Sequence, residues 1–116
     1  MNKENNNKNE LIVCIINDGF SDLVMYAAKN AGARGGTIFH AKGTGNSDIE
    51  KFFGITITPE KEIVFIIVEK DQKDEIVSAI YKEAGLDTKG QGIVFTLPVD
   101  DFVGPSLVEE ESPEKL

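Results

Sequence analysis

Two uninterrupted apolar runs constrain the fold of this chain more than any other feature. Residues 11–16 and 63–68 are apolar at every position and rich in β-branched side chains. Runs of this length and composition are typical of strands that are covered on both faces. Shorter apolar stretches predict two further strands, at residues 37–41 and 93–97, and we expect the last strand to end at Pro98.

Helical periodicity follows each of the two long runs. Apolar residues at spacings of three and four predict helices at residues 21–31 and 71–84. Capping residues stand at both ends of each predicted helix. The candidate N-caps are Asp18 or Ser21 for the first helix and Asp71, in a capping box with Asp74, for the second; the candidate C-caps are Gly32 and Gly85.

The resulting order, β-α-β-β-α-β, is that of the ferredoxin-like fold, an α+β fold with a four-stranded antiparallel sheet and two helices on one face. In this topology the runs 11–16 and 63–68 are the central strands. Both runs place apolar side chains on both faces of the sheet, whereas two helices can cover only one face. We therefore expect the second face to pack against other copies of the chain, because open apolar faces of this size are rare on monomers. The alternative, that the tails fold back over the sheet, is disfavoured by their polarity.

The composition limits the domain organisation and the classes of partner. The 116 residues include 12 basic and 20 acidic side chains, which give a net charge of −8. We expect one folded domain at residues 10–106, between a flexible N-terminal tail at 1–9 and an acidic C-terminal tail at 107–116. The acidity argues against nucleic acid as a partner, and no apolar run approaches the roughly 18 residues of a membrane span. The polar start of the chain, without a signal peptide, predicts a cytoplasmic protein.

Glycines concentrate in two segments that connect the predicted strands and helices, residues 32–45 and 85–92. Such segments let another group approach backbone N–H donors closely. A phosphate or a nucleotide base could use these donors, or the glycines could serve only as tight turns and helix C-caps. Neither a Walker motif nor a G-x-G-x-x-G that opens a helix is present.

The sequence resembles the PII signal-transduction superfamily in three stretches, at residues 32–37 (GARGGT), 41–45 (AKGTG) and 85–95 (GLDTKGQGIVF). The element order and spacing of residues 10–106 agree with this resemblance. It implies a ferredoxin-like homotrimer with the sheets facing inward and an adenine nucleotide, ATP or ADP, in each cleft between subunits. It also implies a non-catalytic regulator whose loop, here residues 43–59, docks on a target protein such as a membrane transporter or a metabolic enzyme.

The resemblance also implies which residues contact the nucleotide. Those expected at the base are Gly35, Gly36, Thr37 and Ile67. Those expected beside the phosphates are Lys42, Gly43 and Gly45, where the effector loop begins, and Lys89, Gly90, Gln91 and Gly92. Arg34 and Lys42 could supply charge that the family carries elsewhere.

The chain also departs from the family's pattern. Ser47 stands where the family has a glutamine that helps to hold magnesium and 2-oxoglutarate, and Asn46 where it has an arginine. Ile93 replaces a lysine, and Gly104 and Ser106 replace two arginines. These differences argue against 2-oxoglutarate sensing. They support adenine binding better than triphosphate binding, and they leave a need for magnesium open.

The effector loop is short, and its apolar residues have two interpretations. Residues 46–58 number only 13 and include no tyrosine. Ile55 and Ile57 favour a hairpin on the same subunit. Phe52 and Phe53 are instead candidates for contact with a partner protein.

Few residues suit catalysis or metal binding. His40 is the only histidine and Cys14 the only cysteine, so we expect structural roles for both, with no metal site and no catalytic residue. The alternative is a slow nucleotide hydrolase, or a small-anion or metal-binding trimer of the same fold. A hydrolase needs a base, and Asp87, Asp100 and Asp101 are the carboxylates nearest the loops in sequence.

Overall fold

The computed structural model of the chain describes residues 8–45 and 50–104. Outside the described part lie residues 1–7 of the expected N-terminal tail, the expected C-terminal tail at 107–116, and three departures from the PII pattern, Asn46, Ser47 and Ser106. None of the described helices is long and apolar enough to cross a membrane.

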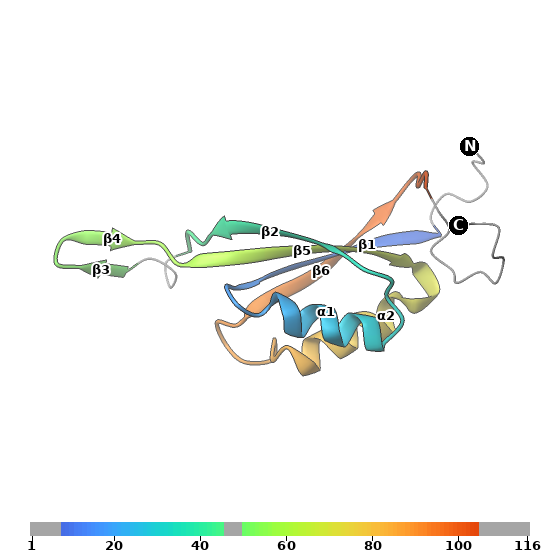
Figure 1. The fold of residues 1–116 in the computed structure, drawn as a ribbon, viewed down its shortest axis with the longest axis horizontal. Helices are drawn as coiled ribbons and strands as arrows, with labels where there is room; N and C mark the ends of the chain where they lie inside the picture. The colour runs from blue at the N-terminus through green and yellow to red at the C-terminus, as the bar shows by residue number, and fades with distance from the viewer. Residues whose placement is uncertain (1–7, 46–49, 105–116) are drawn as a thin grey trace.

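The described chain has the element order that the sequence predicts, with one added hairpin. The elements of the main domain are β1 (Asn9–Asn17), α1 (Ser21–Asn30), β2 (Thr37–Lys42), β5 (Glu60–Glu69), α2 (Lys70–Glu83) and β6 (Gly92–Val99). Between β2 and β5, the short strands β3 (Glu50–Phe52) and β4 (Ile55–Ile57) form a separate hairpin. The four longer strands make an antiparallel sheet in the order β2-β5-β1-β6, with both helices on one face (Figure 1). The predicted ferredoxin-like α+β fold is therefore confirmed.

β1 and β5 are the central strands, as the two apolar runs predict. They pair along their whole length, from Asn9 opposite Glu69 to Asn17 opposite Lys61. Successive residues of a strand point to opposite faces. With this register, the even-numbered residues of all four long strands face the helices, and the odd-numbered residues face away.

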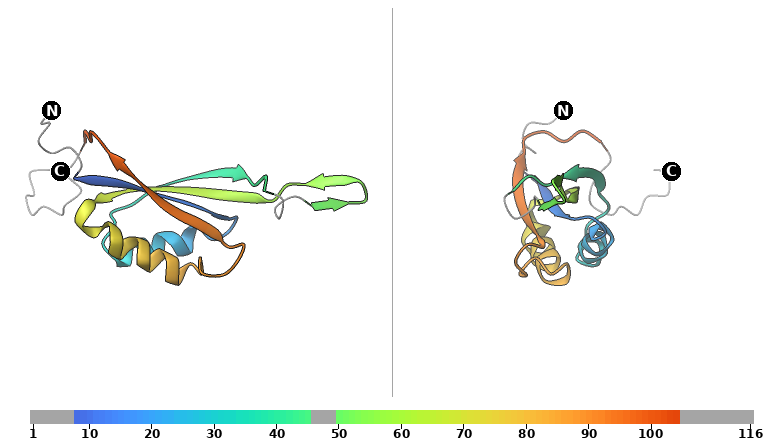
Figure 2. Two further views of the ribbon diagram at one scale, coloured as in Figure 1. Left: turned by 180° about the vertical axis from the view of Figure 1, so that it is seen from behind. Right: turned by 90° about the vertical axis from the view of Figure 1, so that its left-hand side faces the viewer.

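The hydrophobic core lies between the sheet and the two helices, which sit on the same side of it in both views of Figure 2. Its main side chains are Ile12, Cys14, Ile16, Val64, Ile66 and Val68 from the sheet, and Val24, Ala27, Ala28, Ile76, Ile80 and Ala84 from the helical side. Cys14 is a small buried hydrophobe, as predicted, and burial raises the pKa of its thiol to about 12. The thiol therefore stays protonated and unreactive at neutral pH.

The opposite face of the sheet is apolar, and the described part of the chain leaves most of it uncovered. Its apolar residues are Leu11, Val13, Ile15, Phe39, Ile63, Phe65, Ile67, Ile93, Phe95 and Leu97. Phe39 and Phe65 pack edge to face, with ring centroids 4.8 Å apart. The exposed fraction reaches 56% at Ile93 and 47% at Leu97. The sheet thus has an open apolar face, as the sequence predicts.

The predicted N-cap of the first helix is wrong. α1 begins after Phe20 and receives no side-chain cap from Asp18 or Ser21. Instead, Oε1 of Glu62 on β5 accepts hydrogen bonds from the Gly19 and Ser21 amides, at 3.0 and 3.1 Å. A carboxylate from a distant strand satisfies these donors, so the local pattern could not reveal it.

The predicted capping box of the second helix is also wrong. α2 begins after Glu69 without a side-chain cap, and the Lys70 amide donates to the carbonyl oxygen of Lys8 at 2.8 Å. Asp71 and Asp74 lie inside the helix. The start of β1 lies against the start of α2, so a backbone oxygen takes the place of a capping side chain.

The other ends of both helices agree with the sequence. α1 and α2 end at the C-caps Ala31 and Ala84. Gly32 and Gly85 follow directly, with φ of +118° and +72°. Positive φ at this position is what a glycine after a helix allows.

The last strand continues past Pro98, contrary to the prediction. β6 runs to Val99, and Pro98 lies opposite Glu10 of β1. β6 is an edge strand, so one side of its backbone needs no hydrogen-bond partner, and a proline without an N–H is tolerated there.

The β3–β4 hairpin projects beyond the end of the sheet, where β2 ends and β5 begins (Figure 1). Its two-residue turn, Phe53 and Gly54, has φ of +52° and +81°, which is typical of a type I′ hairpin. The hairpin predicted from Ile55 and Ile57 forms. It projects from the sheet and leaves Ile55 65% exposed, so the expected packing on its own subunit is not seen for Ile55. Phe52 lies in β3, and the Phe53 side chain at the turn is 90% exposed.

Candidate functional site

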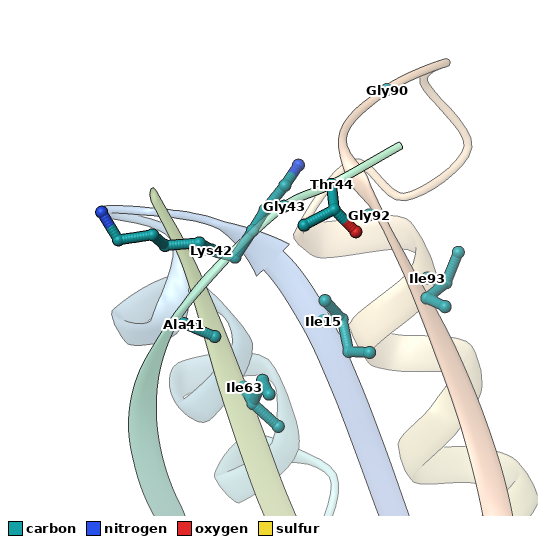
Figure 3. Close-up of a pocket in the computed structure, with 10 residues that line it drawn as sticks. Ile15, Ala41, Lys42, Gly43, Thr44, Ile63, Gly90, Gly92 and Ile93 are labelled. Carbon is teal, nitrogen blue, oxygen red and sulfur yellow. The ribbon is translucent and has the colours of Figure 1, made fainter. Parts of the chain in front are cut away.

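Most residues of the predicted site line two hollows on the open face of the sheet. We name the first the hairpin-end pocket (Figure 3), because it lies at the end of the sheet from which the hairpin projects in Figure 1. It has a volume of about 440 Å³ and is lined by Ile15, Ala41, Lys42, Gly43, Thr44, Lys61, Ile63, Gly90, Gly92 and Ile93. It joins two of the three predicted groups, the start of the effector loop and the segment around Gly90.

The floor of the hairpin-end pocket is apolar. Ile15 of β1 lies between its register partners, Ile63 of β5 and Ile93 of β6, and Figure 3 shows the three side chains on neighbouring strands. Ile93 stands where the resemblance expects a lysine. The floor therefore offers only apolar surface, and a charged group of a ligand would depend on other lining residues, such as Lys61.

Two expected phosphate contacts have backbone amides that are already hydrogen-bonded within the chain. The Gly43 amide donates to the carbonyl oxygen of Pro59 at 2.9 Å, and the Gln91 amide donates to that of Thr88 at 3.2 Å. A ligand would have to replace these bonds. Tight turns, the plainer interpretation of a glycine-rich segment, account for these two amides.

Gly90 and Gly92 differ in the space around them. A Cβ at Gly92 would lie 2.5 Å from the carbonyl oxygen of Ile15, so close packing of β6 on β1 requires a glycine there. At Gly90, where φ is +85°, nothing lies within 4 Å of a Cβ position. Gly90 is therefore the residue of this pair whose backbone an incoming group can approach closely. Gly45 and Lys89 are exposed and are not among the lining residues.

A buried lysine that the sequence pattern did not indicate also lines the pocket. Lys61 is 9% exposed, and its Nζ donates to Oδ1 of Asn17 at 2.7 Å. Nδ2 of Asn17 donates in turn to the carbonyl oxygen of Gly90 at 3.1 Å and to Oε1 of Gln91 at 3.2 Å. This network holds the 90–91 loop against the end of β1. The sequence signal that could have indicated this network is that polar residues, Asn17 and Lys61, flank the two long apolar runs.

Lys42, the expected phosphate cation, has a carboxylate neighbour. Its Nζ lies 3.5 Å from Oε2 of Glu60, and the two side chains are 66% and 55% exposed. Ion pairs this exposed contribute little stability. Lys42 and Lys61 are both among the residues that line the hairpin-end pocket.

The second hollow, which we name the far-end pocket, holds the third predicted group. It has a volume of about 330 Å³ and is lined by Leu11, Arg34, Gly35, Gly36, Thr37, Phe65, Ile67 and Phe102. All four residues expected at the base are among them. A Cβ at Gly36 would lie 2.9 Å from the carbonyl oxygen of Phe65, so the chain after α1 approaches β5 closely.

The predicted site is divided between the two pockets, which lie at opposite ends of the sheet within one chain. On β1 they are marked by Ile15 and Leu11, and on β5 by Ile63 and Ile67. Each pair is four residues apart, which is about 13 Å along a strand. A single chain therefore does not bring the expected base contacts and phosphate contacts into one pocket.

A cluster of titratable side chains lies on the helix side of the sheet, beside the start of α1. It consists of Asp18, His40 and Glu62, whose possible ligand atoms lie within 4.8 Å of one another. The His40 imidazole, for which we expected a structural role, is 70% exposed and has its Nδ1 3.7 Å from Oδ1 of Asp18.

Glu62 of this cluster is ionised at neutral pH. Burial raises the pKa of Glu62, but the hydrogen bonds from the Ser21 and Gly19 amides outweigh burial and hold the pKa below its ordinary value. Donors directed at a carboxylate favour its charged form. Glu62 is therefore an anion when it accepts the hydrogen bonds that hold the start of α1.

Comparisons with known proteins agree with this architecture. The family model described as nitrogen regulatory protein P-II matches residues 9–104. The crystal structure of Arabidopsis thaliana PII bound to citrate is similar, with a TM-score of 0.64 and 26% sequence identity. The similarity covers 80% of this chain and 78% of the Arabidopsis chain. A comparison with curated proteins finds no match.

Proposed function

Because the chain belongs to the nitrogen regulatory protein P-II family, we propose that it is a trimeric signalling protein that binds an adenine nucleotide between its subunits. In this proposal nucleotide binding shifts residues 43–59 from a disordered to an ordered conformation, and this segment then docks on a target protein. The observation that carries the proposal is the division of the expected site between the two ends of one open apolar face.

The open face supports assembly into a ring. Exposed aromatic and aliphatic side chains such as Phe95 and Leu97 gain free energy when a second chain removes them from water. A head-to-tail contact brings the hairpin-end pocket of one chain against the far-end pocket of the next. Contacts of this type close into rings, and the PII resemblance implies a ring of three.

The chemistry of the two pockets is consistent with the two parts of a nucleotide. The far-end pocket offers Leu11 and Ile67 as apolar surface beside the backbone of Gly35, which suits a planar base. The hairpin-end pocket offers Gly90 and Lys61, which suit phosphate oxygens because they combine an open backbone with a cation.

Calorimetry on the full chain with ATP, ADP and AMP tests nucleotide binding. We expect Lys61→Gln to weaken binding about tenfold, the loss of roughly one charge-assisted hydrogen bond. Lys82→Gln, which makes the same charge change on an exposed position of α2, should bind as the unmodified chain does. Absence of heat with all three nucleotides would refute nucleotide binding, and equal affinities of the two variants would refute the role of Lys61.

Light scattering at micromolar concentration tests the assembly separately. We expect a mass three times the 12.7 kDa of one chain. A monomeric mass would remove the shared cleft and with it the proposed site.

A small polycarboxylate is a second candidate ligand, because the structurally similar Arabidopsis PII has citrate bound. Lys61 gives the hairpin-end pocket one cation for such an anion. Ile93 and Gly104 stand at positions that are basic in the family pattern, so this chain has fewer cations there. Citrate is therefore a further arm of the calorimetry. Saturable citrate binding that Lys61→Gln abolishes, without a response to nucleotides, would favour this candidate.

The hairpin tip supports docking on a target such as a transporter or a metabolic enzyme. Phe53 places an aromatic side chain, 90% exposed, at the end of a projecting ribbon, and exposed aromatics are favoured at protein interfaces. Phe53→Asn, which tolerates positive φ, should reduce co-purification of the target without changing nucleotide affinity. Unchanged co-purification would exclude Phe53 from the contact.

A further inference from the structure

We propose that Asp18, His40 and Glu62 form a binding site for a divalent transition-metal ion, with Zn²⁺ as the best match. The three side chains come from the β1–α1 turn, β2 and β5, and their possible ligand atoms lie within 4.8 Å of one another. They lie on the helix side of the sheet, whereas both pockets lie on the open side. The single histidine led us to expect no metal site, but a lone imidazole can be joined by carboxylates from other segments.

The spacing of His40 and Asp18 is that of two ligands rather than of a hydrogen-bonded pair. Nδ1 and Oδ1 are 3.7 Å apart, which is too long for an N–H···O hydrogen bond. Two ligand atoms, each about 2.1 Å from Zn²⁺ at the tetrahedral angle, lie about 3.4 Å apart. Both side chains are more than half exposed, so small rotations can close the remaining difference.

Glu62 supplies a third ligand that is already oriented. Glu62 is buried, with only 7% of the residue exposed. Oε1 accepts the Gly19 and Ser21 amides at 3.0 and 3.1 Å. Hydrogen bonds behind a ligand hold it in place for a metal. A carboxylate has about four lone-pair directions, so an ion can bind while both amides stay bonded.

The charge and donor types select the class of ion. Two carboxylates and a neutral imidazole carry two negative charges, which match a divalent cation. The imidazole favours Zn²⁺ and its neighbours in the transition series over Mg²⁺ and Ca²⁺, which prefer oxygen ligands alone. The nearby Lys42, two residues along β2 from His40, has Glu60 as its own ion-pair neighbour at 3.5 Å.

The position of the site gives a bound ion a mechanical effect. His40 and Glu62 lie on β2 and β5, the two strands that lead into and out of the hairpin, and they are register partners. An ion held between them and Asp18 ties both strands to the β1–α1 turn. Metal binding should therefore stabilise the base of the segment at residues 43–59.

The single histidine makes the first test direct, because His40 supplies the only imidazole resonances of a tag-free full chain. We expect these resonances to shift with ZnCl₂ and to saturate at one ion per chain. The thermal midpoint should rise by about 5 °C at saturation. MgCl₂ at the same concentration should produce neither change. Imidazole resonances that do not respond to Zn²⁺ would overturn the proposal.

Variants then locate the ligands by calorimetry with ZnCl₂. His40→Gln and Asp18→Asn should each weaken Zn²⁺ binding at least about tenfold. Glu60→Gln removes the same charge as Asp18→Asn from a neighbouring exposed position and should change affinity by no more than about twofold. Thermal melts without metal check that each variant folds.

Three results would contradict the site. The first is no saturable Zn²⁺ binding below about 1 mM. The second is an equal loss for Glu60→Gln and Asp18→Asn, which would indicate general attraction to an acidic surface. The third is unchanged affinity in His40→Gln, which would place the ion elsewhere.

Discussion

The two faces of the same four-stranded sheet carry similarly apolar residues in different surroundings. Ile12 and Ile66 on the even-numbered face are fully buried beneath the helices, whereas Ile93 and Leu97 on the odd-numbered face are 56% and 47% exposed. The strands alone do not produce this difference, because it arises from which face the helices cover. One face therefore stabilises the chain, and the other is available for assembly and for a ligand.

The largest expected effect is on the helix-covered face. Ile66→Ala leaves a cavity in the core and should lower the free energy of unfolding by about 2–5 kcal/mol, measured by chemical denaturation. Leu97→Ala on the open face should cost less than about 1 kcal/mol at concentrations where the chain does not assemble. Equal losses would show that the two faces contribute alike to folding.

Glu62→Gln should produce the next largest effect, because the two hydrogen bonds at the start of α1 lose the negative charge of their acceptor. We expect about 1.5–3 kcal/mol at pH 7, measured by denaturation across pH. Folding lowers the pKa of Glu62, so its stabilisation is present above the unfolded pKa and is lost as pH falls through the folded pKa. The difference from the unmodified chain should therefore shrink below about pH 4.

The exposed Glu60 provides the control for this pH dependence. Glu60→Gln removes the same charge from the same strand but from a carboxylate that holds no helix start. A similar pH profile in both variants would mean that general charge, not the hydrogen bonds to Gly19 and Ser21, causes the effect.

A smaller loss is expected at a backbone contact of the sheet itself. Gly92→Ala brings a Cβ to 2.5 Å from the carbonyl oxygen of Ile15 at a φ of +152°, which should cost about 1–3 kcal/mol in thermal or chemical unfolding. Gly35→Ala has nothing within 4 Å and should stay within about 0.5 kcal/mol. A neutral Gly92→Ala would mean that β6 can move away from β1.

The smallest effect on folding, but a decisive one on assembly, is expected from Leu97→Asp. The isolated chain should change by no more than about 1 kcal/mol, whereas light scattering should report a monomer because a charge is buried between subunits. Tyr81→Asp on α2 is the matched control, since Tyr81 and Leu97 are both 47% exposed. Loss of assembly in the control as well would place the interface on the helices.

The element order could be predicted because it depends on patterns within each segment. The runs at 11–16 and 63–68 became β1 and β5, and the open face followed from counting two helices against four strands. The helix starts were wrong for the opposite reason. Glu62 lies 43 residues from Gly19, and a local pattern cannot indicate a partner at that distance.

The candidate site was predictable only in part. The resemblance indicated some of the residues that line each pocket, but it could not show that Gly43 and Gln91 use their amides within the chain. Lys61 and Asn17 meet only through strand pairing. Their sequence signal, a polar residue at the end of an apolar run, is shared by many strands that bind nothing.

By itself, the sequence determined the ferredoxin-like order, the central strands and the apolar character of both faces, because hydrophobic periodicity is a local property. Only the tertiary structure decided which residues meet across the sheet. The strand register placed the two parts of the expected nucleotide site at opposite ends of the sheet. It also brought Asp18, His40 and Glu62 together beside α1. The physical reason is that strand pairing joins segments distant along the chain, and their contacts depend on a register that neither segment specifies alone.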